Sequence, residues 1–78
     1  MNLAIENQKK IQTRIGSLVI PRPAIPPMTA DDSQRNVAIH NARAFKNRAI
    51  ACLAALSFEA AERNTKKAEH FAKFAVTA

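Results

Sequence analysis

A repeating pattern of apolar residues runs through the middle of the chain. The apolar positions recur at alternating intervals of four and three residues: Ala38, Ala42, Phe45, Ala49, Cys52 and Leu56. This spacing places their side chains on one face of an α-helix, which Leu53 and Ala60 widen. Thr29 is a residue type that caps helices, and Asp31 and Asp32 suit a first helical turn. The pattern therefore predicts a helix that begins near residue 30.

The stretch at residues 49–61, AIACLAALSFEAA, holds a single charged residue, Glu59. The earlier part of the predicted helix has a polar side, and this polarity stops after Arg48. A helix that is apolar on all sides needs cover on every side. We expect part of that cover to come from another molecule, contacted by Ala54 and Phe58.

A shorter helix is predicted ahead of this one, over about residues 2–15. Asn2 can cap its start, and Glu6 and Lys10 have the i,i+4 order that supports a helix. Gly16 is the only glycine in the chain. It is well placed to end the helix in a left-handed conformation.

The segment at residues 17–28, SLVIPRPAIPPM, cannot be helical, because it contains Pro21, Pro23, Pro26 and Pro27. One interpretation is a stiff spacer of polyproline type. The other is a docking strip that becomes ordered only on binding, because four of its residues are apolar: Val19, Ile20, Ile25 and Met28. A PxxP motif at residues 23–26 adds little, since such motifs are common by chance.

The position of the next helix break is less clear in the sequence. Asn64 could end one helix and Thr65 could cap the next, although an unbroken helix over residues 30–76 stays open. We predict an all-α protein, a small bundle of two to three helices at about residues 2–15, 30–62 and 65–77, in a single domain over residues 1–78. Phe71 and Phe74 are then expected to pack on Leu53 and Leu56.

Composition limits how stable such a bundle can be. The chain has 78 residues, and its hydrophobic fraction of 47% includes no Trp or Tyr and many alanines. A chain of this length is marginally stable alone, and alanine contributes little buried area. The formal net charge of +6 and the pI of about 10.3 favour acidic partners.

The sequence carries little that could support catalysis. Gly16 stands alone, so there is no glycine-rich phosphate loop. His40 and His70 lie too far apart for a helix-borne metal site. Cys52 is the only cysteine, which excludes an internal disulfide and, within the apolar face, suggests an inert buried thiol. We expect no catalytic or metal-binding residues, no cofactor, and no enzyme activity.

The favoured function is binding to a larger protein or protein assembly, as a subunit, adaptor or inhibitor. The partner is expected to present an acidic surface, and a second copy of the chain is a further candidate. The expected contact residues are Val19, Ile20, Ile25, Met28, Ala54 and Phe58. Small accessory proteins of phages and mobile elements often have this profile, which is an analogy only.

Nucleic-acid binding is the alternative function. One polar side of the predicted second helix could contact phosphates and bases through Asn36, His40, Arg43, Lys46 and Asn47. A membrane role is disfavoured, because no apolar run reaches the roughly 20 residues of a membrane span. The order of residues in MNLAIENQKK also differs from that of a secretory signal. We expect an intracellular, cytoplasmic protein.

Overall fold

The chain folds into three helices. The computed structural model describes residues 3–77, and the side chains of residues 5–76 within them. Helix α1 spans Leu3–Gly16, α2 spans Ala30–Ala54 and α3 spans Phe58–Thr77, with no strand in the described range. The predicted all-α bundle is confirmed, and it has three helices. The expected cap at Asn2 lies outside the described residues.

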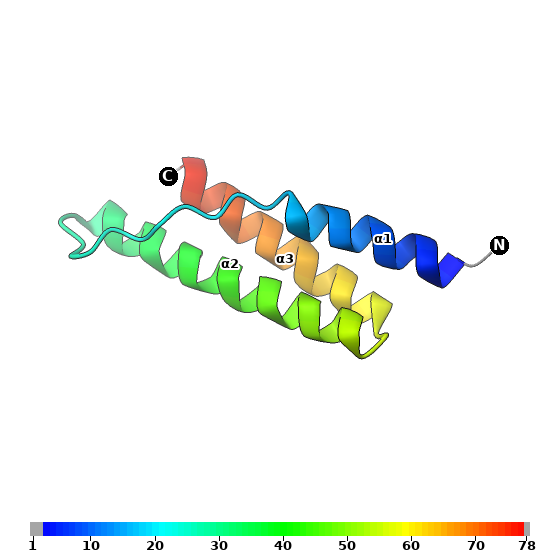
Figure 1. The fold of residues 1–78 in the computed structure, drawn as a ribbon. Helices are drawn as coiled ribbons and strands as arrows, with labels where there is room; N and C mark the ends of the chain where they lie inside the picture. Colours follow the sequence, from blue (N-terminus) through cyan, green and yellow to red (C-terminus); the bar gives the residue numbers. More distant parts are fainter. Residues whose placement is uncertain (1–2, 78) are drawn as a thin grey trace.

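Helices α2 and α3 form an antiparallel hairpin, and the rest of the chain lies along it (Figure 1). Helix α1 lies alongside the half of the hairpin near the α2–α3 turn. The proline-rich segment then runs along the other half, towards the start of α2. Thr29 caps α2 as expected, its hydroxyl accepting a bond from the Asp32 amide at 3.0 Å.

Alanine side chains form the contact between α2 and α3. Ala42 and Ala49 on α2, and Ala61 and Ala68 on α3, are completely buried. Because alanine has only a methyl group, the two backbones can approach closely and still be well packed. Thr65 is also completely buried, and its hydroxyl donates to the Ala61 carbonyl at 2.7 Å. This internal bond satisfies the only polar group of its side chain.

The break between the second and third helices occurs at residues 55–57, so the expected break at 62–67 is wrong. Asn64 and Thr65, which we interpreted as an end and a cap, lie inside α3. Their side chains donate to the carbonyls of Ala60 and Ala61, four residues earlier. Such bonds let these residue types occur within a helix as well as at its ends.

The turn itself is a Schellman motif without glycine. The Ser57 amide donates to the Cys52 carbonyl at 2.8 Å, and the Leu56 amide donates to the Leu53 carbonyl at 3.0 Å. This pattern requires a left-handed residue after the helix cap. Leu56 takes that conformation, with φ of 62°, and is 67% exposed. The fully apolar helix expected at 49–61 is therefore two helix ends joined by a turn.

Moving the turn changes which residues face each other. In an antiparallel hairpin, the facing residue shifts twice as far along the chain as the turn does. Leu53 therefore shares a cluster with Ala61, while Phe71 packs near Ala38 and Ala75 at the far end. The expected packing of Phe71 and Phe74 on Leu53 and Leu56 is wrong for this reason.

The hydrophobic core is divided into two small clusters along the hairpin. The first joins Ile11 and Ile15 of α1 to residues near the turn, namely Ala49, Leu53 and Ala61. The second joins Ala38, Ile39 and Ala75, with Ile20 of the proline-rich segment packed against it. Each part of the chain before α2 thus contributes side chains to one cluster.

The molecule is a thin rod of 52 × 19 × 15 Å. Its radius of gyration is 14.0 Å, whereas a compact domain of this length has about 11.5 Å. Its accessible surface is 5466 Å², against roughly 4,700 Å² expected from its mass. Several large apolar side chains are therefore left exposed.

The conformations of Gly16 and Leu56 are the reverse of what their residue types favour. Gly16 ends α1 without a positive φ, so the expected left-handed conformation is wrong, and a Cβ there would meet no atom within 4 Å. We expect Gly16→Ala and Leu56→Gly each to stabilise the fold by about 0.5–1 kcal/mol. Thermal unfolding followed by circular dichroism would show Tm increases of a few degrees. Leu56→Ala is the control, because it removes the leucine but keeps the strained Cβ.

The close helix contact gives a second prediction. Ala49→Leu should destabilise the fold by about 1–3 kcal/mol, because the added atoms must separate α2 from α3. Ala51→Leu adds the same atoms to the same helix at an exposed position, and should change stability little. Urea denaturation measures the free energy of unfolding of both variants. Equal values for Ala49→Leu and Ala51→Leu would contradict the close packing of α2 against α3.

Candidate protein-binding surfaces

Helix α1 is attached to the hairpin mainly through α3. Ile11 and Ile15 pack into the first cluster. Beside them, the Arg14 guanidinium donates to Glu69 of α3 at 2.5 and 3.4 Å, and lies 3.9 Å from Glu62. The hydrogen bonds to Glu69 raise the pKa of Arg14, with both carboxylate charges adding to this against the effect of partial burial. The guanidinium therefore stays charged and orients α1 along α3.

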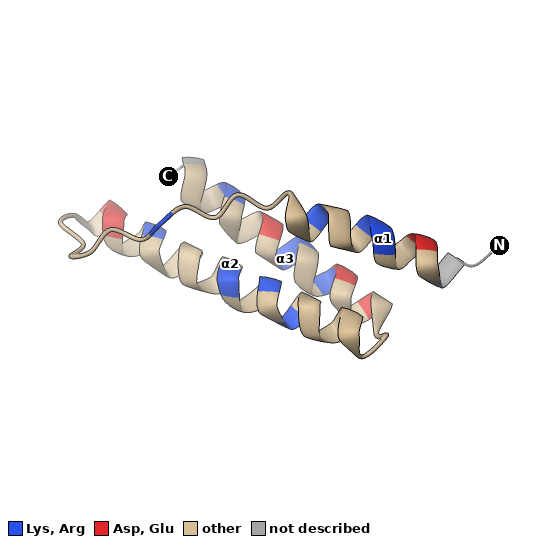
Figure 2. Ribbon diagram, in the orientation of Figure 1, with Lys and Arg blue, Asp and Glu red and all other residues tan. Residues whose placement is uncertain are grey.

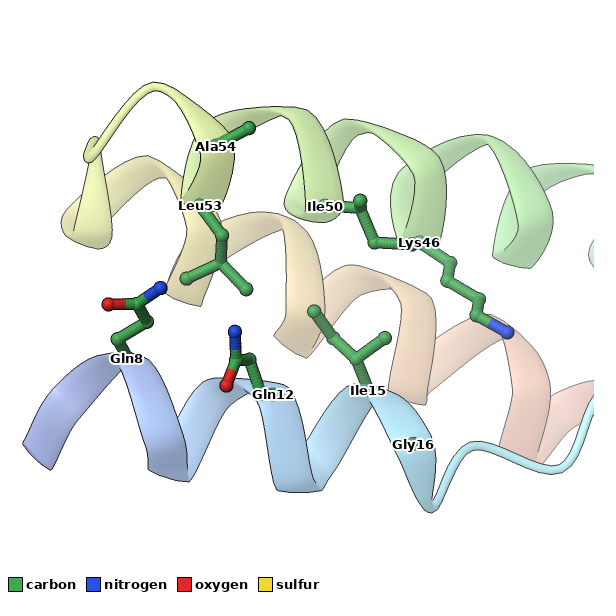
Figure 3. Close-up of a pocket in the computed structure, with 8 residues that line it drawn as sticks. All are labelled: Gln8, Gln12, Ile15, Gly16, Lys46, Ile50, Leu53 and Ala54. Carbon is green, nitrogen blue, oxygen red and sulfur yellow. The ribbon is translucent and has the colours of Figure 1, made fainter. Parts of the chain in front are cut away.

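A groove remains between α1 and α2, because α1 contacts α3 more extensively than it contacts α2. It has a volume of about 460 Å³. Figure 3 shows Ile15 of α1 and Leu53 of α2 pointing into it from opposite sides. Ile50 is 47% exposed there, although it is a large apolar residue. The remaining lining residues are Gln8, Gln12, Gly16, Lys46 and Ala54.

The groove combines apolar and polar side chains. Its lining is apolar at the centre, with the amides of Gln8 and Gln12 on one side and the cation of Lys46 at one end. No carboxylate is among its lining residues. Ala54, which the sequence predicts as a contact residue, is exposed.

The proline-rich segment is held by the chain's own residues. The Asn36 side chain of α2 makes two bonds to the Ala24 backbone, accepting from its N–H at 2.9 Å and donating to its carbonyl at 2.8 Å. Ile20 packs against the second cluster. The segment therefore has contacts within the chain itself, and its ordering only on binding stays a prediction. The bonds to Asn36 satisfy the backbone N–H and carbonyl of Ala24, so these groups need neither a β-sheet nor another molecule.

The predicted contact residues have different environments. Val19, Ile25 and Met28 are 70%, 86% and 81% exposed. Ile20 and Phe58, by contrast, are partly buried against the chain's own clusters. Three apolar side chains of the proline-rich segment are therefore accessible, whereas Ile20 and Phe58 pack against the core.

The residues predicted to contact nucleic acid are also divided. His40, Arg43 and Asn47 are exposed along one side of α2. Asn36, however, is committed to the proline-rich segment, and Lys46 is partly buried beside the groove. Only part of the predicted set is therefore available together.

A third surface lies on the side of the hairpin away from α1. We call it the open face, and define it by Val37, Asn41, Phe45 and Arg48 of α2 with Lys67, His70, Phe71 and Phe74 of α3. The rings of Phe45 and Phe71 are parallel, with centroids 5.7 Å apart. The cations of Arg48 and Lys67 each lie 5.3 Å from the centroid of Phe45.

Sequence reasoning missed both the Asn36 anchor and the open face. Phe45 and Arg48 are three residues apart in α2, and Lys67 and Phe71 are four residues apart in α3. The sequence therefore places each pair on one face of its helix. Their meeting depends on the position of the turn. Nothing in the sequence links Asn36 to Ala24, because the bond joins a side chain to a backbone.

The described residues lack two further classes of site. Their side chains form no group of three or more His, Cys, Asp or Glu that could hold a metal ion. None of the described helices has the length and apolar character needed to cross a membrane. Cys52 is a partly buried free thiol, 3.6 Å from the Asn64 amide nitrogen.

Comparison with known proteins does not identify a relative. No protein-family model, no curated protein and no solved structure matches this chain. Its function is therefore inferred from its own surfaces.

The Asn36 anchor gives a third prediction. Asn36→Ala removes both bonds to Ala24, each contributing about 1 kcal/mol. Cleavage of the proline-rich segment by thermolysin, which cuts before large apolar residues, should accelerate about thirtyfold while the helix content is unchanged. Asn47→Ala is the control, because Asn47 is an exposed asparagine of the same helix. Unchanged cleavage in Asn36→Ala would mean that other contacts hold the segment.

Proposed function

We propose that this chain is a non-enzymatic binding module that docks on a larger protein, as a subunit, adaptor or inhibitor. The observation that carries the proposal is the groove between α1 and α2. Its apolar lining includes Ile50, which is 47% exposed, beside Ile15 and Leu53, which are buried at 7% and 6% exposure. Concave apolar sites with a few polar groups at their edges are typical of binding sites.

The shape of the molecule supports this proposal. A rod of small helices exposes more surface than a compact domain of the same mass, and part of that surface is apolar. A partner that covers Ile50 and the floor of the groove would add buried area close to the first core cluster. Binding would then also stabilise the fold, because a ligand of the native state shifts the folding equilibrium.

The charge of the chain indicates the nature of the partner. Its net charge of +6 favours an acidic surface and accelerates the encounter. No carboxylate lines the groove, while Lys46 stands at one end. We therefore propose a protein partner that places an apolar side chain in the groove and a carboxylate near Lys46. The single cysteine supports a cytoplasmic location as part of this proposal.

Nucleic-acid binding is the second candidate function. The observation in its favour is the exposed set of His40, Arg43 and Asn47 on one side of α2. These side chains could contact phosphates and base edges of a duplex. Because Asn36 already bonds Ala24, the surface is smaller than the sequence indicated.

The groove proposal is tested by Ala54→Glu, which places a charge at its edge without entering the α2–α3 contact. The tagged protein would be isolated from its native cells, with nuclease treatment and at rising salt. We expect a protein to co-purify with the wild type and to be lost with Ala54→Glu. Ala51→Glu introduces the same charge one turn earlier at an exposed site outside the groove, and should retain the partner.

Three results would oppose the groove proposal. Retention of the partner by Ala54→Glu would exclude the groove as its site. A loss of thermal stability in Ala54→Glu but not in Ala51→Glu would mean that the position is structural. A complex that disappears with nuclease, and whose affinity falls with log salt by about 0.9 per phosphate contact, would support the nucleic-acid alternative.

A further inference from the structure

The open face shares no residue with the groove, and it carries basic residues but no acidic one. Glu62 and Glu69 of α3 are both paired with Arg14 of α1. Glu59 lines a small cavity with residues of α1. All three carboxylates of α3 are therefore on the side that faces α1, and none belongs to the open face.

The basic residues of the hairpin have the opposite distribution. Beyond its first turn, α2 carries only basic charged residues, and Figure 2 shows these positions along the helix. The cations of Arg48 of α2 and Lys67 of α3 each lie 5.3 Å from the centroid of the Phe45 ring. Both cations belong to exposed residues. They leave a positive region with no acidic side chain of the open face to neutralise it.

The other end of the open face is apolar. A hollow of about 230 Å³ lies there between α2 and α3. Val37, which is 60% exposed, and Phe74, which is 46% exposed, line it together with Phe71 and Asn41. A hollow of this size accepts one large apolar side chain.

The distance between the two ends is set by α2. Val37 and Arg48 are eleven residues apart, which corresponds to about 16 Å, or three turns, along the helix. A ligand helix lying along the hairpin would need its apolar residue and its acidic residues separated by a similar length.

We propose that the open face binds an acidic amphipathic helix of another protein. The helix places a large apolar side chain in the hollow beside Val37 and Phe74. About three turns further along, its carboxylates pair with Arg48 and Lys67. Helices that lie in grooves commonly use apolar anchors on one face in this way.

Two other occupants fit the surface less well. A second copy of the chain would bring no carboxylate from its own open face, so the cations of both copies would be buried unpaired. Nucleic acid would supply negative charge, but the Phe45 ring already contacts Phe71, Arg48 and Lys67 and offers no free stacking surface. The apolar hollow also has no use in phosphate binding.

The test uses a fluorescein-labelled synthetic helical peptide and fluorescence anisotropy with the full chain. The peptide carries two leucines on one face and two glutamates three turns further along that face, on an alanine–glutamine background. One control peptide has the glutamates one turn from the leucines, and a second has lysines in their place. We expect the first peptide to bind at least about tenfold more tightly than either control.

Substitutions in the chain locate the binding surface. Arg48→Gln combined with Lys67→Gln should weaken binding about tenfold and reduce its salt dependence. Val37→Glu should abolish it, with the helix content checked by circular dichroism. Ala54→Glu lies in the groove and should bind the peptide as the wild type does, so failure of one site is distinguished from failure of the other.

The proposal is overturned if the three peptides bind equally, or if both open-face variants bind like the wild type. It is also overturned if the wild type forms a dimer by sedimentation that Val37→Glu disrupts, since the occupant would then be a second copy. The proposal is likewise overturned if a DNA oligonucleotide binds more tightly than the peptides and this binding is lost with Arg48→Gln and Lys67→Gln. The ligand of the open face would then be nucleic acid.

Discussion

The close contact between α2 and α3 determines the rest of the structure. Ala42 and Ala49 of α2, and Ala61 and Ala68 of α3, are completely buried, and their small side chains allow the two helices to pack closely. Such a contact is well packed but contains little apolar area per residue. It creates a narrow hairpin with two long sides, and the remaining residues must cover those sides.

The described residues before α2 cover one side of the hairpin only. Helix α1 packs near the turn, and the proline-rich segment continues along the other half with Ile20 in the second cluster and Asn36 bonded to Ala24. The open face receives no element of the described chain. Because α1 also contacts α3 more extensively than it contacts α2, a groove remains beside it. Both candidate binding surfaces therefore result from the same shortage of covering residues.

Charge is sorted by the same arrangement. Arg14 on α1 attracts Glu62 and Glu69, and each ion pair is partly exposed and contributes no more than about 1 kcal/mol. The carboxylates of α3 lie on the side of the hairpin that faces α1, because their positions in the helical repeat place them there. Arg48 and Lys67 are on the other side, where each cation lies near the aromatic ring of Phe45. Arg48 and Lys67 thus form a localised positive surface on the open face, although the net charge of the chain is modest.

The helical class, the cap at Thr29 and the non-helical proline-rich segment follow from local chemistry, because periodicity, capping side chains and proline act within a few residues. The turn was not predictable in this way. Leu56 takes a left-handed conformation that its residue type disfavours, and Thr65 resembles a cap but bonds within α3. Only the tight packing of alanines from two distant segments selects residues 55–57 as the turn. That selection brings Phe45 to Phe71, because facing positions in a hairpin depend on where the chain reverses.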